Sequence, residues 1–492
     1  METKLTGKLL LVVLLLAALP VTGQTSFYRV FSGNGYDKGE GACQLPDSSF
    51  LITGTSSSFE EAPSQVFLMH IDSAGTFLWS KAYGGSESEE GKRVMAVPGY
   101  GYYVAGTSSS SGSGDFDNYL FFTDESGDQQ WQVFTDNGGW ERIHDAELLP
   151  DTTIFTVGET DSNTTSNPDV FLVRYSKTGA VLWSNQLGSD HEDIAYACER
   201  ASDTTVLVAG TYYVADSLQN KGWLAMIRIS DGSVLWQKMY GVKGDYQFND
   251  VSLFNGQVKA VGERVETGQS EHDTYDVITD IADGNLLLSE ESLQPGDNRI
   301  VSCVQYQPGP NGKFFIGMQT INPFTPTFED GEDAQIHRYT EYLYWDNYGT
   351  SYSGVGQDQF NQMIRTSDGF ALAVGFHTTY GPGGNSVMVV KIGDDQYFPP
   401  LTTNVVYDIL NLEELTVLKD IRVYPNPVNE QLFVHVPGES FTYVLADATG
   451  KQLSAGAAYG DEVIDFSGQR AGFYFLQVRH ESGETALMKI VK

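Results

Sequence analysis

Acidic residues recur along this chain at a spacing that puts them in equivalent places of a repeated structure. Six follow one another at intervals of 52 residues and a seventh comes later: Asp37, Glu89, Glu141, Asp193, Asp245, Asp297 and Asp358. Hard cations such as calcium collect several oxygen ligands, so these carboxylates are candidate metal ligands if they converge. Alternatively, each acid accepts hydrogen bonds from backbone N–H groups and fixes a turn. Repetition in every copy favours the structural role.

The spacing belongs to a longer repeat, which is clearest at DVFLVRYSKTGAVLW, from Asp169 to Trp183. Alternating residues, a turn containing Gly179 and a second apolar segment predict a β-hairpin. In each copy a glycine ends an apolar strand: Gly54, Gly106, Gly158, Gly210, Gly262, Gly317 and Gly375. The steps are 52, 52, 52, 52, 55 and 58 residues. Such a period, without helical periodicity inside it, is typical of the blades of a β-propeller.

Each copy divides into four predicted strands, but the last copy has only three. The strand SVMVVKI is followed by Gly393 and then by Pro399 and Pro400, with no fourth strand. At the other end of the chain, SFYRVFSGNG (Ser26–Gly35) resembles the fourth strand of the other copies. We therefore expect an all-β fold in which residues 24–398 form a seven-bladed propeller, closed by an N-terminal strand that removes the open sheet edges. A frayed N-terminus is the alternative.

The blade motif itself resembles a known family of repeats. An acid, a strand ending in Gly-Thr, a D-x-x-G turn and a Leu-Trp pair follow in order, with tryptophans at Trp79, Trp131, Trp183 and Trp236. This order is similar to the tryptophan-containing β-propeller repeats of secreted bacterial proteins, over about Ser26 to Phe398. The resemblance implies a fold but no activity, because propellers serve as enzymes, lectins and scaffolds alike.

Composition and the N-terminus indicate export. The net charge of −35 argues against nucleic-acid binding, which depends on basic groups that displace counterions. Residues 1–23 have the pattern of a secretory signal peptide, since Lys4 and Lys8 precede an apolar run, Leu9–Leu19, that is too short to span a bilayer. We therefore expect no transmembrane segment in the mature chain. The three cysteines, Cys43, Cys198 and Cys303, occupy comparable strand positions and are expected to be small apolar filler.

The loops after the second strand of each copy vary most, and all should emerge on one face of the propeller. Variable polar loops on a rigid scaffold are where recognition usually takes place. Their aromatic residues either stack on sugar rings or peptides, or pack within their own loops: Tyr212, Tyr213, Phe324, Phe328 and Tyr380. No residue pattern assigns a catalytic residue or a cofactor other than the possible calcium site, although two suitably placed carboxylates would suffice for a glycan-active enzyme.

The C-terminal part differs from the repeats. Residues 399–420 are predicted to be a linker, and 421–492 contain VYPNPV, a D-x-x-G-K turn, GFYFLQV and the terminal MKIVK. These motifs resemble the type A C-terminal sorting domain of type IX secretion system cargo of Gram-negative bacteria; a generic Ig-like adhesive module is the alternative. The residues that carry the resemblance are Tyr424, Pro425, Asn426, Pro427, Asp447, Gly450, Lys451, Gly472, Tyr474, Lys489 and Lys492.

The resemblance implies a small Ig-like β-sandwich that the outer-membrane translocon reads. The domain is then cut off in the linker or exchanged for a surface glycolipid anchor. The sequence thus predicts a protein exported through the periplasm to the cell surface or the medium, where the propeller binds a protein, glycan or other polymer partner. The alternative is an extracellular glycan-active hydrolase or lyase on the same scaffold.

Overall fold

The computed structural model describes most of the chain from residue 26 to residue 492. The segments outside the description, besides 1–25, are 60–61, 112–114, 163–166, 293–297, 307–312, 322–331, 341–344, 353–355, 379–383, 393–404, 408–421, 426, 448–451, 471 and 481–484. The predicted signal peptide therefore lies outside the described residues. Within the described chain the regular structure is entirely β, and no helix there is long and apolar enough to cross a membrane.

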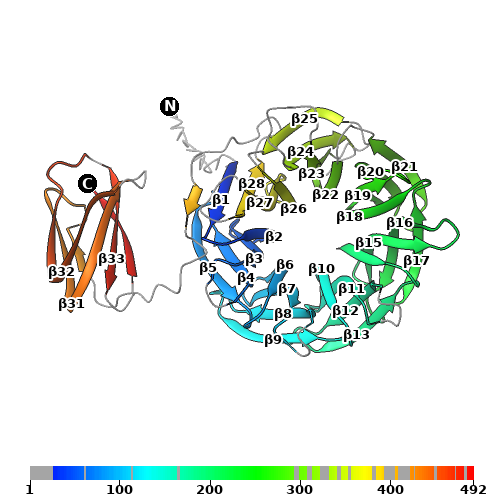
Figure 1. Ribbon diagram of the computed structural model, residues 1–492, viewed down its shortest axis with the longest axis horizontal. Helices are drawn as coiled ribbons and strands as arrows, with labels where there is room; N and C mark the ends of the chain where they lie inside the picture. Colours follow the sequence, from blue (N-terminus) through cyan, green and yellow to red (C-terminus); the bar gives the residue numbers. More distant parts are fainter. Residues whose placement is uncertain are drawn as a thin grey trace, which may run out of the picture.

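Seven antiparallel sheets are arranged around a common axis, as the sequence predicts (Figure 1). Blades 1 to 3 contain β2 (Asp37–Gln44), β3 (Phe50–Ser56), β4 (Gln65–Ile71) and β5 (Phe77–Tyr83); β6 (Glu89–Val97), β7 (Gly101–Ser108), β8 (Asp117–Thr123) and β9 (Gln129–Thr135); and β10 (Glu141–Leu148), β11 (Ile154–Thr160), β12 (Asp169–Tyr175) and β13 (Val181–Leu187). Blades 4 and 5 contain β14 (Ile194–Arg200), β15 (Thr205–Val214), β16 (Gln219–Arg228) and β17 (Val234–Tyr240); and β18 (Asp245–Phe254), β19 (Gln257–Val265), β20 (His272–Asp280) and β21 (Leu286–Ser292). Blades 6 and 7 contain β22 (Asn298–Tyr306), β23 (Lys313–Ile321), β24 (Glu332–Thr340) and β25 (Trp345–Tyr352); and β26 (Asp358–Arg365), β27 (Ala371–His377) and β28 (Ser386–Ile392).

The seventh blade is completed by the N-terminal strand β1 (Phe27–Ser32), which confirms the predicted ring closure. β1 pairs antiparallel with β28, with Phe27 opposite Lys391 and Phe31 opposite Val387. A short strand from the predicted linker, β29 (Val405–Tyr407), adds to the outer edge of β1 in parallel. The seventh sheet therefore has five strands, of which β1 precedes the other repeats in the chain and β29 follows them.

The repeated glycine is explained by a β-bulge on the innermost strand of each blade. The pairing of the first two strands shifts register at the same place in all seven blades, for example between Ile143 and Asp145. The bulge pushes an inner-strand carbonyl against the glycine, so a Cβ at Gly158 would lie only 1.8 Å from the Arg142 oxygen. Gly317 is the exception, because the register of β22 and β23 places Met318, not Gly317, opposite the residue before the bulge, Ile300. Glycine is required where another backbone approaches this closely.

The repeated tryptophan and the D-x-x-G turn form two halves of one contact between blades. Trp79 on β5 packs on the turn at Gly127 of the next blade, and Trp131 packs on Gly179 in the same way. Large apolar clusters fill the spaces between neighbouring sheets, such as the one shared by blades 7 and 1. Burial of these side chains between sheets is what holds the blades together.

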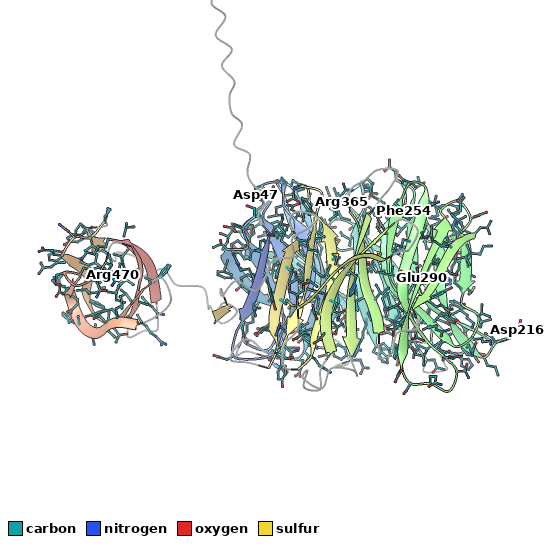
Figure 2. All side chains as sticks on the ribbon, turned by 90° about the horizontal axis from the view of Figure 1, so that it is seen from above. Asp47, Asp216, Phe254, Glu290, Arg365 and Arg470 are labelled. Atoms are coloured by element: carbon teal, nitrogen blue, oxygen red, sulfur yellow. The ribbon has the colours of Figure 1, made fainter. Side chains whose placement is uncertain are left out.

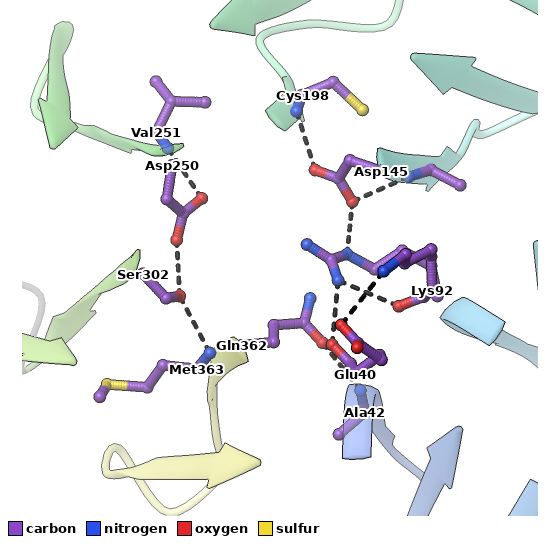
Figure 3. A network of polar contacts seen from close by, with 12 residues as sticks. Glu40, Ala42, Lys92, Asp145, Cys198, Asp250, Val251, Ser302, Gln362 and Met363 are labelled. Atoms are coloured by element: carbon purple, nitrogen blue, oxygen red, sulfur yellow. Dashed lines mark hydrogen bonds and ion pairs between the residues drawn. The ribbon is translucent and has the colours of Figure 1, made fainter. Parts of the chain in front are cut away.

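Polar side chains next to the bulges link neighbouring blades near the axis (Figure 3). Arg93 donates from Nε to Asp145 Oδ1 at 2.5 Å, and Asp145 Oδ2 accepts the backbone N–H of Cys198 at 2.8 Å. Farther round the ring, Ser302 donates to Asp250 at 2.6 Å. Across the closure, Gln362 accepts the N–H of Ala42 at 2.7 Å. These bonds join residues that are 52 or more positions apart, so sequence patterns alone did not indicate them.

The C-terminal strands form a separate five-stranded sheet: β30 (Arg422–Tyr424), β31 (Gln431–Asp447), β32 (Gln452–Asp465), β33 (Phe473–His480) and β34 (Thr485–Val491). The pairing of β31 with β32 is interrupted between His435 and Ser440. Residues from both halves of β31, such as Val434 and Leu445, belong to one buried cluster, so the sheet folds over into a small sandwich. The domain limits 24–398, 399–420 and 421–492 stay predictions.

Candidate functional site

The acids of the 52-residue spacing stand at the connections between blades. Five of them are fully buried: Asp37, Glu89, Glu141, Asp193 and Asp358. Each one accepts hydrogen bonds from groups at its own connection, so these five hold separate junctions. Asp245 is exposed, and Asp297 lies outside the described residues. A calcium role for the set as a whole stays a prediction.

The first junction illustrates how these acids work. The backbone N–H of Gly33 donates to Asp37 Oδ2 at 2.7 Å, and the hydroxyls of Ser56 and Ser58 donate to Oδ1 at 2.5 and 2.8 Å. Burial raises the pKa of Asp37, and these donors oppose that rise. The carboxylate therefore ties the connection between blades to the start of the loop after the second strand.

Two other junctions use variations of this arrangement. Asp193 Oδ1 accepts the N–H of Tyr213 at 2.6 Å, whereas Asp358 Oδ1 accepts the N–H of Thr378 at 3.0 Å and lies 3.1 Å from Nδ1 of His377. Burial lowers the pKa of His377 to about 4, so the imidazole is neutral at pH 7 and its contact with Asp358 is a hydrogen bond.

The loops that follow the second strands lie on one face of the propeller, which we call the loop face. Figure 2 places Asp216, from the β15–β16 loop, at the opposite end from Asp47 and Phe254, which lie at turns between first and second strands. The loop face is thus the face that carries the buried acids, since those acids bond to the bases of these loops. The geometry agrees with the predicted position of the recognition loops.

The β15–β16 hairpin of blade 4 projects outward from the ring (Figure 1). β15 and β16 are ten residues long and pair to the end, with Val214 opposite Gln219. At the tip, Leu218 is 75% exposed and has a φ of 54°, a conformation that a leucine side chain disfavours. Val242, in the connection to blade 5, is 82% exposed. Two aliphatic side chains are therefore presented to solvent on this face.

The aromatic residues of the loops make different ring contacts. Tyr212 packs near Trp223, with ring centroids 5.9 Å apart, which is a contact within its own blade. Tyr213 stacks on His191 at 3.7 Å between centroids, and the two rings are nearly parallel. Phe324, Phe328 and Tyr380 lie outside the described residues.

A cavity of about 510 Å³ lies between blades 3 and 4 on the face opposite the loop face. Turn residues of both blades line it, including Asp151 and Thr204, together with Leu235 of β17. Arg174 crosses it with an ion pair to Asp151 at 2.6 Å and a hydrogen bond to the carbonyl of Ile229 at 3.1 Å. Sequence patterns did not indicate this cavity, because its lining comes from turns that look like ordinary connections.

The sorting motifs fall at the ends of strands in the C-terminal domain. Tyr424 ends β30, precedes a cis peptide bond to Pro425, and stacks on Phe433 with 5.6 Å between centroids. Both rings are partly exposed, as is Pro427. Asn426, Gly450 and Lys451 lie outside the described residues, whereas Asp447 ends β31 and Lys489 lies in β34.

The last residue is fixed to the same domain. Gly472 and Lys492 exchange two backbone hydrogen bonds of 2.9 Å, and Lys492 Nζ donates to the carbonyl of Phe466. Tyr474 is buried, and its hydroxyl donates to the carbonyl of Arg470 at 2.6 Å. The motif residues Gly472, Tyr474 and Lys492 thus hold the C-terminus against the sandwich.

Comparisons with known proteins found one family match and several similar solved structures. Residues 422–492 match the family of secretion system C-terminal sorting domains. The chain is similar to the WD40 domain of Neurospora crassa Pan2 (10% identity, 77% of this chain, 92% of that chain, TM-score 0.42). It is also similar to Sqt1 from Chaetomium thermophilum (12% identity, 74% of this chain, 98% of that chain, TM-score 0.44). A third similar structure is the β-propeller domain of the Trilobed protease from Pyrococcus furiosus (9% identity, 78% of this chain, 98% of that chain, TM-score 0.42).

No curated protein matches the chain in sequence. The sorting domain implies export to the cell surface or the medium. The chain is therefore a β-propeller protein that carries a type IX secretion system C-terminal sorting domain.

Proposed function

We propose that the protein is an extracellular binding protein that holds a protein or glycan partner on its loop face. The observation that carries the proposal is the projecting blade 4 hairpin, where Leu218 is 75% exposed in a disfavoured backbone conformation. Strained, exposed residues on a rigid base are typical of binding sites, because folding alone gives no reason to keep them.

The base of this surface is held firmly. Gln219 Nε2 donates to Thr267 Oγ1 at 2.8 Å and links the hairpins of blades 4 and 5. The N–H of Asn220 donates to Asp245 at 2.8 Å, which ties the hairpin to the connection that contains Val242. A surface that is ordered before binding loses little conformational entropy when a partner docks. Leu218 and Val242 would supply the apolar contacts, and the His191–Tyr213 stack would offer a flat face to a sugar ring or peptide.

A screen of the purified full chain against glycan arrays and bacterial and host surface proteins tests this proposal. We expect a saturable partner whose binding is lost in the double variant Leu218→Asp/Val242→Asp. The matched control is Leu78→Asp, which changes a half-exposed leucine on the outer strand β5. Binding that survives the double variant, or that is lost equally in the control, would contradict the assignment to this face.

A glycan-active enzyme remains the second candidate, and the inner strands provide one specific reason. Burial raises the pKa of Glu147 to about 7 and that of Glu199 to about 8, so both carboxyls hold protons near neutral pH as a general acid must. Release of product from any polysaccharide in the same screen, abolished by Glu199→Gln, would favour this candidate over simple binding.

A further inference from the structure

Three carboxylates meet at the loop-face junction between blades 2 and 3. Asp117 begins β8, Asp136 follows β9 and Glu141 begins β10. One oxygen from each lies within 4.8 Å of the other two. Asp117 and Glu141 are buried, whereas Asp136 is exposed. Like charges so close together repel one another strongly where water is excluded, and no lysine or arginine among the described residues forms an ion pair with any of the three.

Glu141 contributes a buried oxygen without a partner. Thr160 donates to Oε1 at 2.7 Å, and the backbone N–H of Asn137 also approaches the carboxyl. Even so, Oε2 accepts no hydrogen bond from any described residue. A buried polar atom left unsatisfied is costly, and it points to a group that the chain itself does not supply.

The nearest cationic side chain in the sequence does not supply the missing charge. Arg142 directs its guanidinium over the rings of Phe116 and Trp140, with 4.9 and 5.6 Å to the centroids. Within the described chain it forms no ion pair with Asp117, Asp136 or Glu141. The cluster is therefore open to a cation from solution, through the exposed side of Asp136.

The repeats provide internal comparisons for this junction. By strand register, the three equivalent positions are Gln65, Gly84 and Glu89 between blades 1 and 2; Asp169, Gly188 and Asp193 between blades 3 and 4; and Lys221, Gly241 and Asp245 between blades 4 and 5. Of these four junctions, only the one between blades 2 and 3 has an acid at all three positions. The symmetry that favours a structural role for the single acids is broken here.

The junction between blades 4 and 5 shows what this position accommodates. Lys221 replaces Asp117, and its buried ammonium donates to the carbonyl of Gly244 at 3.2 Å. The charge of Asp245 attracts it and opposes the lowering of the Lys221 pKa by burial. A positive charge beside the acid of the next blade is thus part of the structure where the chain can provide it.

We propose that the junction between blades 2 and 3 binds a hard divalent cation, calcium, through Asp117, Asp136 and Glu141. Calcium coordinates oxygens at about 2.3–2.6 Å, so oxygens on one ion lie up to about 5 Å apart, which matches the cluster. Carboxylates without histidine or cysteine favour calcium over zinc or copper. Because Asp117 and Asp136 belong to blade 2 and Glu141 to blade 3, the ion would clamp two blades together at the base of the loop face.

Calorimetric titration of the purified full chain with calcium chloride, after removal of metal with a chelator, tests the proposal. We expect one tight site per chain and a rise in melting temperature that the chelator reverses. Asp136→Asn, at an exposed position, should fold normally and weaken calcium binding by roughly tenfold or more, because it removes one charged ligand. Terbium luminescence, excited through the neighbouring Trp140, gives a second measurement of occupancy.

Glu89→Gln is the matched control, because Glu89 has the same repeat position and also a buried Oε2 without a partner, yet its junction has Gln65 and Gly84 in place of the two aspartates. It should leave the tight calcium site unchanged. The absence of calcium heat and of any melting shift would overturn the proposal. Several weak sites, unaffected by Asp136→Asn, would also overturn it, since they would reflect only the net charge of −35.

Discussion

The ring of Phe27 lies against the turn at Gly75, where an added Cβ would come within 2.8 Å of it. Trp79 occupies the same relation to Gly127, 52 residues farther along. Phe27 therefore performs in the borrowed strand the task that tryptophan performs in blades 1 to 4: it packs one blade against the next. The ring is closed by a side chain contact as well as by the pairing of β1 with β28.

Phe27→Ala should weaken this closure. Removal of a fully packed aromatic ring typically costs about 3–5 kcal/mol, and Phe27 is only 3% exposed. We expect the urea midpoint to fall accordingly, and limited proteolysis to release the N-terminal segment first. Leu218→Ala, at a solvent-exposed tip, serves as the control and should leave the midpoint unchanged. Equal midpoints for wild type and Phe27→Ala would show that β1 does not lock the ring.

Gly158→Ala should destabilise blade 3, because the new methyl group would press on the carbonyl of Arg142. Overpacking of this kind costs roughly 1–3 kcal/mol. The same substitution at Gly317 provides a comparison within the repeat, since Gly317 pairs with Ser302 beyond the bulge and the nearest described side chain would lie 3.7 Å from its Cβ. Chemical denaturation of the two variants should separate them clearly, and a similar loss in both would argue against the bulge as the reason for the glycine.

Arg93→Met should destabilise the centre of the ring. The guanidinium is paired with Asp145, and both side chains are mostly buried. Loss of one partner leaves a buried charge without compensation, at a cost of about 3–5 kcal/mol. The double variant Arg93→Met/Asp145→Asn should recover part of that loss, because an amide can still accept the N–H of Cys198. A double-mutant cycle with no coupling would refute this account.

The stability of the chelator-treated protein should depend on the titration of Glu141. Burial raises its pKa from 4.5 to about 7, so the folded chain binds this proton more tightly than the unfolded chain. The contribution of protonated Glu141 to the free energy of unfolding is therefore fully present below pH 4.5, and it is lost as the pH rises to about 7. Between pH 5 and pH 8, the melting temperature should therefore fall less for Glu141→Gln than for wild type. Glu271→Gln, at an exposed position, should follow wild type; identical curves for all three would contradict the prediction.

Deletion of residues 422–492 should stop the last step of export. In a bacterium with a type IX secretion system, we expect the truncated protein to accumulate in the periplasm, as measured by fractionation and immunoblotting. Tyr424→Ala tests whether the exposed stack with Phe433 takes part in recognition. Its matched control is Tyr459→Ala, since that tyrosine is 71% exposed in the same domain but outside the motifs. Undiminished secretion of the truncated chain would refute the role of the domain.

The sequence predicted the blades well because each one repeats a local pattern. The glycine steps, the hairpin turns and the similarity of Ser26–Gly35 to a fourth strand are all visible in the order of residues. The reason for the glycine was not visible, because the bulge at Asp145 appears only when two strands are paired. Nor did the sequence indicate that residues 431–447 form one long strand, β31, since Pro437 and Gly438 within it are residues typical of a turn.

The candidate sites were harder to predict for the same reason. The acid spacing located Glu141, but Asp117, at the start of β8, and Asp136, after β9, belong to the preceding blade, and no spacing in the sequence marks them as neighbours of Glu141. Likewise, the exposure of Leu218 depends on the length of the hairpin that carries it. Turn residues such as glycine and asparagine do not indicate how long the paired strands are. Contacts between blades are set by packing in three dimensions.

The borrowed strand also determines the order in which the molecule can be finished. β1 is the first strand of the repeat region to be synthesised, yet its partner β28 ends at Ile392. Until that strand exists, Phe27 and Phe31 have nowhere to be buried, and an unpaired β-edge is prone to aggregate. The last blade can therefore be completed only after β28 has been synthesised, and β1 remains without its antiparallel partner until nearly the whole propeller has been made.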